Sequence, residues 1–377
     1  MSERRLWLVA LAVVAMAATG AVLQTWLVAD DRIPFSSDQA VVGLMAMHIL
    51  AGNGHPVFYF GATYGGSFEA HLLAVVFALV GPSIEAYRAT MAGLTWLVIA
   101  GVTALTWRWF GRRAGMTALA YLCVPPFFFL YKGLTSDGAN DSVQLAGIGT
   151  NAAAMWRDDA LERHGSEWLP ALLLGGLAGF GLWITPVCLP VSAAAFAWLI
   201  VRRAPRLAPW TVPVMAAGAL VGGFPWWVWN LRHGWASLKA PEMVSATVPS
   251  ALRNLAVLAK DAFAVLTGIG EPHQGILLAV PFRFAWLAMI VAVVGLLLPA
   301  ARATWKGERR PRLLFLSLGV LCVAAAFSSR FSAVEPRYLV AFYVLVPPLL
   351  GIGVAAYSRG RYAVLPLAAC LAVVFTV

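Results

Sequence analysis

The sequence predicts an all-α polytopic membrane protein with about eleven transmembrane helices, each roughly 20 residues long. Apolar residues make up 61% of the 377-residue chain, and charged residues only 12%. The mean hydropathy of +0.79 is far above the soluble average. Apolar runs of this length are predicted to be helices, because hydrocarbon leaves every backbone amide to be satisfied within its own segment.

Charge sets the expected topology. Arg4 and Arg5 precede the first apolar segment, which exceeds the roughly 7–15-residue core of a secretory signal and is interpreted as a retained helix. Short clusters of Arg and Lys follow alternate segments, as in cytoplasmic loops, so the N-terminus is expected in the cytoplasm. The expected spans are residues 6–28, 85–107, 115–131, 142–156, 168–184, 186–201, 210–229, 277–300, 312–328, 338–356 and 362–377.

The topology depends on how residues 64–81 are assigned. Counting this apolar stretch as a span would reverse every later loop and move arginine pairs such as Arg202–Arg203 to the outside. The stretch is therefore predicted to be a helix lying in the membrane interface. Two large outer loops result, residues 29–84 and residues 230–276.

The chain is interpreted as one transmembrane domain, residues 1–377, and its end without a polar exit is typical of a fragment. Its four cysteines lie in apolar runs and form no metal-ligand spacing. The net charge of +10 is divided among short loop clusters, which argues against a nucleic-acid partner. The sequence contains no phosphate-binding loop, dinucleotide fingerprint or nucleophile elbow.

Asp38 is the candidate catalytic residue. It lies in the first outer loop, within a predicted capping box that has Ser36 at the N-cap and Gln39 three residues later. A helix beginning here and continuing through residues 40–50 is too short to span a membrane. Two roles stay open from this motif alone: catalysis at the membrane surface, or stabilisation of the first helical turn.

Further acidic and basic residues lie at expected outer boundaries. Glu69 follows Gly65 and Gly66, which permit a tight turn or a close backbone approach to a ligand. Asp141 and Lys132 flank a short loop between two spans, near the level of a lipid-linked phosphate. Ionisable groups there are costly and often functional, although a lysine at a helix end can also extend its amine to the interface.

Two arginines contradict the general charge bias. Arg337 and Tyr338 begin the tenth expected span from the outside, where the arginine would pair with Glu335 or bind a phosphate through its guanidinium. Arg88 is at the outer end of the second span and presents the same alternatives, with Glu85 one turn earlier as its neighbour.

These residues also carry a family pattern. Residues 37–46, 58–61 and 64–69 resemble the first outer loop of integral-membrane C-type glycosyltransferases. The nearest branch contains protein O-mannosyltransferases, the lipid A aminoarabinose transferase and bacterial lipopolysaccharide core sugar transferases. Residues 223–234 and 336–339 extend the resemblance, which covers most of the chain and is most specific in the first loop.

The resemblance implies a fold with an amphipathic first loop on the membrane and a site on its extracytoplasmic side. The family's catalytic acid corresponds to Asp38, and its further loop and boundary residues correspond to Glu69, Asp141 and Arg88. Family members transfer a sugar from a polyprenyl phosphate to an extracytoplasmic acceptor, typically with inversion. Gln39 departs from the pattern, since many relatives have a second acid there, which weakens the case for a metal in this loop.

The favoured hypothesis is therefore a glycosyltransferase of the inner (plasma) membrane that uses a polyprenyl-phosphate sugar and a glycan, lipid or protein acceptor. Asp38 would act as the base, and Lys132, Arg88 or Arg337 would stabilise the leaving phosphate. Glu69 and Asp141 would orient substrate hydroxyls or help to bind a divalent cation. A transporter or lipid-sugar flippase, and a non-catalytic assembly subunit, are the alternatives.

Overall fold

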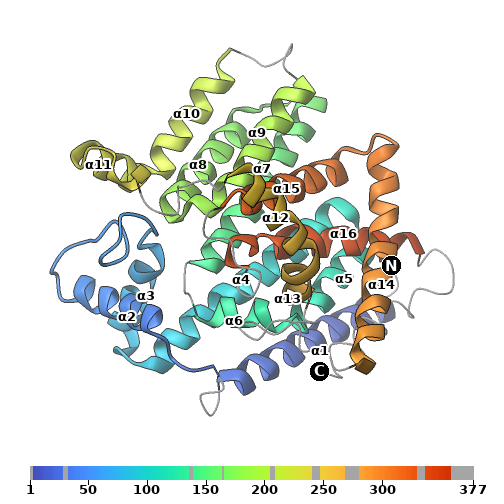
Figure 1. Cartoon of the computed structure of the whole chain (residues 1–377), viewed down its shortest axis with the longest axis horizontal. Coiled ribbons are helices and arrows are strands. Elements are labelled where there is room, and N and C mark those ends of the chain that lie inside the picture. The colour runs from blue at the N-terminus through green and yellow to red at the C-terminus, as the bar shows by residue number, and fades with distance from the viewer. Residues whose placement is uncertain are drawn as a thin grey trace.

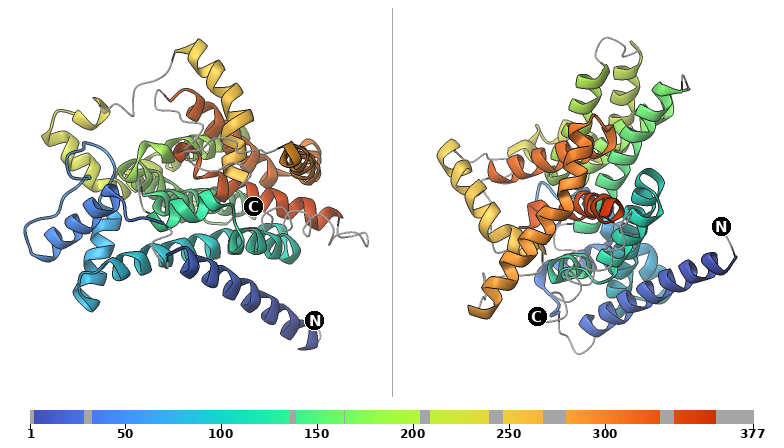
Figure 2. Two further views of the ribbon diagram at one scale, coloured as in Figure 1. Left: turned by 60° about the horizontal axis from the view of Figure 1, so that its bottom comes forward. Right: turned by 90° about the vertical axis from the view of Figure 1, so that its right-hand side faces the viewer.

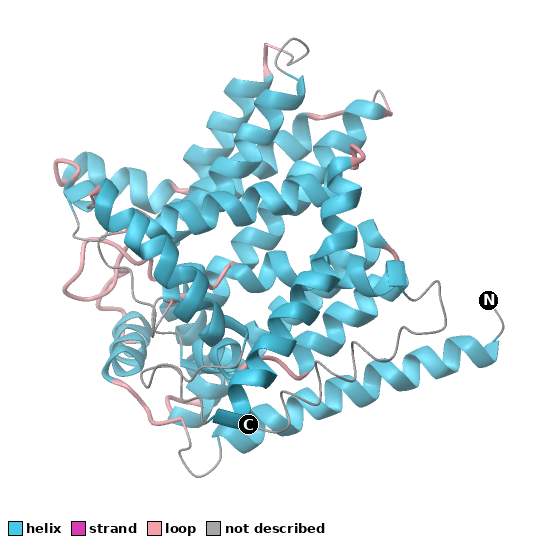
Figure 3. Ribbon diagram, turned by 45° about the vertical axis from the view of Figure 1, so that its right-hand side comes forward, coloured by secondary structure: helices cyan, strands magenta, loops and turns pink. Residues whose placement is uncertain are grey.

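The protein is predominantly helical in the residues that the computed structural model describes, which are 3–28, 33–135, 139–163, 165–203, 209–239, 247–267, 280–328 and 336–357. Figure 3 shows helices joined by loops, and an isolated antiparallel bridge pairs Phe58 with Gly66 in the first loop. The longer helices are α1 (Glu3–Val28), α2 (Ser37–Leu50), α3 (Phe68–Val80), α4 (Ile84–Phe110), α5 (Arg112–Cys123), α6 (Phe127–Thr135), α7 (Asn140–Glu162), α8 (Trp168–Ile184), α9 (Leu189–Arg203), α10 (Thr211–Gly222), α11 (Phe224–Arg232), α12 (Val248–Val257), α14 (Val280–Trp305), α15 (Arg309–Ala326) and α16 (Phe342–Tyr357). Shorter elements are η2 (Pro186–Cys188), η4 (Ala236–Lys239), the π-helix η6 (Leu258–Ala262), α13 (Phe263–Thr267) and η7 (Arg337–Leu339).

Two helices are individually long and apolar enough to cross a bilayer. They are α1, through its part Leu11–Val28, and α4 over Ile84–Phe110. Two bent helix pairs raise the number to as many as four if each pair is one span. The larger number of spans stays a prediction, and the expected span 362–377 lies outside the described residues.

The expected continuous helix over residues 115–131 is wrong. The chain forms α5 and α6 instead, and their axes differ by 71°. The break contains Pro125 and Pro126. Proline has no N–H to donate, and its ring clashes with the carbonyl four residues earlier, which favours a break in the helix at this dipeptide. The dipeptide Pro347–Pro348, by contrast, lies inside α16.

The expected helix over residues 210–229 is likewise two helices. α10 ends at Gly222, and α11 begins at Phe224 with a change in direction of 76°. Pro225 explains the restart, because proline is tolerated in a first helical turn but not in a helix interior.

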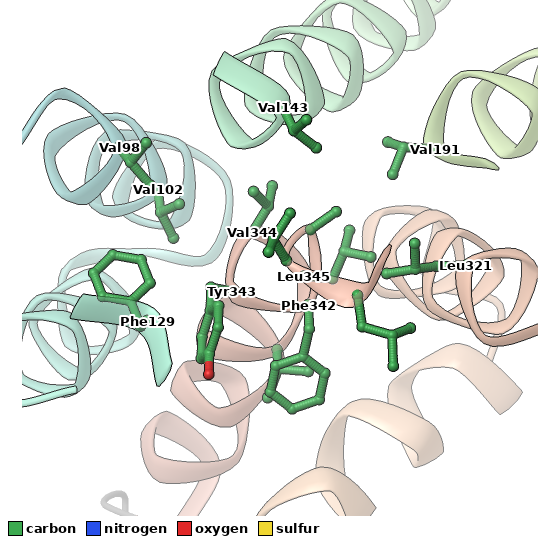
Figure 4. Packing of buried hydrophobic residues seen from close by; sticks show 14 of the residues in the cluster. Val98, Val102, Phe129, Val143, Val191, Leu321, Phe342, Tyr343, Val344 and Leu345 are labelled. Carbon is green, nitrogen blue, oxygen red and sulfur yellow. The ribbon is translucent and has the colours of Figure 1, made fainter. Parts of the chain in front are cut away.

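α16 forms the centre of the main hydrophobic core. It contacts α4, α5, α7, α14 and α15, and nearly all of its side chains from Phe342 to Leu350 are buried. Figure 2 shows this helix enclosed by its neighbours in two further directions. The close-up in Figure 4 shows its side chains meeting those of surrounding helices: Val98 and Val102 of α4, Phe129 of α6, Val143 of α7, Val191 of α9 and Leu321 of α15.

A second, smaller core lies under the first loop. α2 and α3 pack against each other and against the start of α4, and this group stands to one side of the main helical body in Figure 1. Met45 of α2, Leu73 and Phe77 of α3, and Tyr87 and Met91 of α4 are buried together. The first loop is therefore a packed structure that can hold a side chain such as Asp38 in a defined position.

Glycines bring α8 and α10 into backbone contact. Gly175 and Gly179 on α8 face Gly218 and Gly222 on α10, and a Cβ atom on any of the four would overlap the main chain of the other helix. Each pair is separated by three residues, so both members lie on one face of their helix, as in small-residue helix interfaces of membranes. This contact fixes α8, whose C-terminal end supports the first loop.

Candidate functional site

Asp38 begins a properly capped helix, as the sequence predicts. Ser36 is the N-cap of α2, and its hydroxyl accepts a hydrogen bond from the Gln39 N–H. The Gln39 side-chain oxygen accepts a bond from the Ser36 N–H at 2.6 Å, which completes the capping box. Asp38 lies in the first turn and is exposed.

The exposed side of Asp38 meets a cavity of about 460 Å³. Three parts of the chain form its lining: the first loop, the start of α7 with the region after α8, and the junction from α15 through η7 to α16. This volume is in the lower part of the range for small-molecule pockets, roughly 300–1,000 Å³. The lining side chains that carry polar groups are Asp38, Tyr59, Tyr64, Asn140, Thr185, Ser328, Arg337 and Tyr338.

Arg337 and Tyr338 reach this cavity from the opposite end of the sequence. The Arg337 guanidinium lies 5.5 Å from the centre of the Tyr338 ring, within cation–π range. The Tyr338 hydroxyl is buried and has no hydrogen-bond partner among the described residues. A buried hydroxyl without a partner is costly, and a small movement of this side chain would let a ligand in the cavity accept a hydrogen bond from it.

The first loop is anchored to α8 by backbone contacts. The Gly66 N–H donates to the Ile184 carbonyl at 2.7 Å, and the Trp183 indole donates to the Val57 carbonyl at 2.9 Å. An ideal Cβ on Gly66 would lie 2.7 Å from the Trp183 carbonyl oxygen, so only glycine fits. The sequence offers a tight turn or a close backbone approach to a ligand for the Gly65–Gly66 pair, and Gly66 makes its close approach to the α8 backbone instead.

Glu69 and Asp141 come together, but they are buried and do not line the cavity. Their residues are 4% and 2% exposed. The Ser142 hydroxyl donates to Glu69 at 2.7 Å, and the Thr95 hydroxyl donates to Asp141 at 2.9 Å. Each carboxyl is in the first turn of a helix, α3 and α7, so each receives the favourable field of a helix N-terminus.

The pair is electrostatically coupled. Asp141 precedes the apolar part of α7, and its burial raises the pKa of the carboxyl well above the usual range. The nearby Glu69 carboxyl raises this pKa further, whereas the hydrogen bond from Thr95 opposes the rise. Two carboxyls held this closely in a buried setting favour one retained proton over two negative charges.

Lys132 and Arg88 also lie outside the cavity lining. Lys132 is buried at the end of α6, with its ammonium 5.0 Å from the centre of the Tyr131 ring. Arg88 donates to the carbonyls of Val28 and Ile33, at 3.0 and 3.1 Å. These bonds join the end of α1 to the start of the first loop, so the geometry gives Arg88 a role in holding that connection.

Sequence reasoning assigned no side-chain role to five polar residues of the cavity, which are Tyr59, Tyr64, Asn140, Thr185 and Ser328. Tyr59 and Tyr64 lie within the segments that carry the family resemblance, and Asn140 adjoins Asp141, so each had a local signal. Thr185 had none, because the end of α8 meets the first loop only in the folded chain. Glu335, an expected partner of Arg337, lies outside the described residues, as does Asp137 in the short loop between Lys132 and Asp141.

The described residues around Asp38 do not form a ligand set for a divalent cation. No second acidic side chain lines the cavity among them, and they include no group of three His, Cys, Asp or Glu side chains suited to a metal. Glu69 and Asp141 bind Ser142 and Thr95 instead. We therefore assign no chemical step to a metal.

No protein-family profile and no curated protein matches the sequence. Solved structures do resemble the fold. The archaeal oligosaccharyltransferase AglB from Archaeoglobus fulgidus, in complex with an inhibitory peptide and a dolichol-phosphate, matches with a TM-score of 0.59 and 14% identity over 100% of this chain and 56% of that one. A structure of the A. fulgidus oligosaccharyltransferase with Zn and sulfate has a TM-score of 0.59 and 13% identity, over 97% of this chain and 51% of that one.

A third structure of that A. fulgidus enzyme, tethered to an acceptor peptide containing the NVT sequon, has a TM-score of 0.54 and 14% identity over 97% of this chain and 54% of that one. The chain thus spans about half the length of the solved structures that it matches. It has the fold of these oligosaccharyltransferases, which agrees with the fold expected from the resemblance. The amphipathic first loop on the membrane stays a prediction.

Proposed function

We propose that this chain is a glycosyltransferase that moves a sugar from a polyprenyl phosphate to an extracytoplasmic acceptor. The observation that carries the proposal is the convergence of Asp38, Arg337 and Tyr338 on one cavity, from ends of the chain 299 positions apart by their numbering (337 − 38). A carboxylate base and a guanidinium suited to a phosphate are the two charges that this transfer needs. The shared fold with enzymes solved with a dolichol-phosphate and with an acceptor peptide supports a lipid-linked donor.

The chemistry follows from these groups. Asp38 accepts the proton of the acceptor hydroxyl as its oxygen forms a bond to the anomeric carbon of the sugar. The bond from that carbon to the phosphate oxygen breaks, and its electron pair leaves with the lipid phosphate. Arg337 neutralises the phosphate, and Tyr338 donates a hydrogen bond to it. A single displacement of this kind inverts the anomeric configuration.

The lining of the cavity suits a lipid-linked donor. Apolar side chains from η2, α9 and the end of α15 account for much of the wall, and include Val187, Pro190, Ala324 and Phe327. These residues can contact the first part of a polyprenyl chain, while the polar groups face the sugar and phosphate. The packed first loop beside them limits the access of water, whose attack would hydrolyse the donor.

The proposal places the protein in the inner (plasma) membrane as a multi-pass enzyme. Its N-terminus would be cytoplasmic, and the cavity with Asp38 would open to the extracytoplasmic side, as the distribution of arginines predicts. The sugar and the acceptor, whether glycan, lipid or protein, are left to the assay below.

The central experiment compares Asp38→Asn with Asp261→Asn. Asp261 lies in η6 and does not line the cavity, so it is a matched control for loss of one carboxylate. Purified variants are incubated with radiolabelled polyprenyl-phosphate hexoses and pentoses and an envelope extract. We expect Asp38→Asn to abolish transfer and Asp261→Asn to retain it; full activity in Asp38→Asn would refute the role of the base.

A transporter or lipid-sugar flippase is the second candidate, and the two bent helix pairs favour it. Transporters often build binding sites from discontinuous helices. Here, however, no residue of either break lines the cavity that holds Asp38 and Arg337. Counterflow of a labelled polyprenyl-phosphate sugar in proteoliposomes, without sugar transfer, would support this candidate instead.

A further inference from the structure

The side-chain amide of Gln39 makes two hydrogen bonds, one as an acceptor and one as a donor. Its oxygen accepts the Ser36 N–H at 2.6 Å, and its nitrogen donates to the Leu134 carbonyl at 3.4 Å. Only one orientation of the amide satisfies both partners, since a backbone N–H needs an oxygen and a carbonyl needs an N–H. The residue is 2% exposed and does not line the cavity.

The Leu134 carbonyl is in the last turn of α6, where carbonyls have no partner within the helix. Side chains from other helices satisfy this helix end. The Tyr87 hydroxyl of α4 donates a hydrogen bond to the Thr135 carbonyl at 3.0 Å. The Asn140 side-chain amide of α7 donates to the Lys132 carbonyl at 3.3 Å. Gln39 supplies the corresponding bond from α2, so the end of α6 joins α2, α4 and α7.

We propose that Gln39 is a positioning residue that holds the first turn of α2, and with it Asp38, against the end of α6. The inference rests on the proposed function of Asp38 as the base. Asp38 is the preceding residue, with its exposed side chain at the cavity, so a rotation or shift of this turn moves the carboxylate directly. Gln39 acts on the reaction only through that placement.

An amide is required at this position for a physical reason. A carboxylate would retain the bond from the Ser36 N–H, but it could not donate to Leu134. It would also put a buried negative charge beside the C-terminus of α6, where the helix dipole is negative. A protonated carboxyl would restore the donor. The consequence of a Gln39→Glu substitution should therefore depend on pH, whereas that of Gln39→Met should not.

The experiment measures kcat and KM for the donor across pH 5–8, using a radiolabelled polyprenyl-phosphate sugar that the native protein transfers. For Gln39→Glu at the upper end of this range, we expect kcat to fall at least about tenfold with KM within about twofold of native. The ratio of variant to native kcat should rise as the pH falls. Protonation of Asp38 lowers kcat in both proteins, so taking the ratio of the two kcat values removes this common effect.

Gln39→Met supplies the second test. It has no charge and no donor, so its kcat should fall without recovery at low pH; this variant also decides the matter if Gln39→Glu does not fold. Native kcat in Gln39→Met, or a flat ratio for a folded Gln39→Glu, would overturn the inference. If Asp38→Asn abolishes transfer in the same assay, such results would refute only the role of Gln39. Activity in Asp38→Asn would remove the proposed base and this inference together.

Discussion

Replacing Gly175 with alanine tests whether α8 and α10 are held by backbone contact. An ideal Cβ on Gly175 would overlap the carbonyl oxygen of Met215, and would lie 2.7 Å from its carbonyl carbon and 2.9 Å from its Cα. Non-bonded carbons prefer about 3.5–4.0 Å, so the helices must separate locally by at least about 1 Å. A gap of that size removes roughly a quarter to a half of the dispersion energy of each affected atom pair.

The expected cost of Gly175→Ala is therefore about 1–3 kcal/mol, the usual range for overpacking. Gly176→Ala is the matched control one residue away, because its Cβ would lie 3.7 Å from the nearest atom, the Gly218 carbonyl oxygen, in ordinary contact. Alanine also has the better helix propensity, by up to about 1 kcal/mol. We expect thermal unfolding in detergent to begin several degrees lower for Gly175→Ala and to be unchanged or higher for Gly176→Ala. Equal melting temperatures for the two variants would refute the reasoning.

Three further predictions concern the first loop, the helix ends and the cavity. Gly66→Ala should shift the first loop away from α8, because its Cβ would lie 2.7 Å from a carbonyl oxygen of that helix. It should lower the rate of sugar transfer at least about tenfold. The control Gly43→Ala, whose Cβ meets nothing within 4 Å, should remain active. Arg157→Leu should lower the free energy of unfolding by about 3 kcal/mol or more, because the fully buried guanidinium pairs with Glu167 at 2.7 Å. Adding Glu167→Leu should restore part of this free energy, as measured by chemical denaturation. Tyr338→Phe should leave the melting temperature unchanged or raise it, because its hydroxyl is buried with no partner among the described residues. It should reduce kcat/KM by about fivefold if the hydroxyl binds the donor. An unchanged kcat/KM would place that hydroxyl outside the reaction.

Local sequence patterns were reliable where the physics is local. The Ser36–Gln39 capping box is a bond between residues three apart, and it predicts the start of α2 and the position of Asp38 in its first turn. The apolar runs predict the helices because each satisfies its own backbone. Proline favours the two breaks at Pro125–Pro126 and Pro225, but it does not locate them by itself, because α16 continues through Pro347–Pro348.

The spacing of Gly175 and Gly179 can be seen in the sequence, but the helix that packs against them cannot. A glycine shows only that a close approach of another chain segment is permitted. That α10 makes the approach, and that Gly66 meets the end of α8, depends on which helices pack together.

Composition and local spacing by themselves determined that this chain forms apolar helices, and that a capped helix presents Asp38 near its start. Tertiary structure alone decided which other charged groups accompany it. Arg337 reaches the cavity of Asp38, whereas Glu69 and Asp141 are buried beside Ser142 and Thr95. The four charged residues, Asp38, Glu69, Asp141 and Arg337, have similar sequence signals near helix ends. The sequence does not separate them, because the side of a helix that becomes buried is set by neighbours from distant parts of the chain.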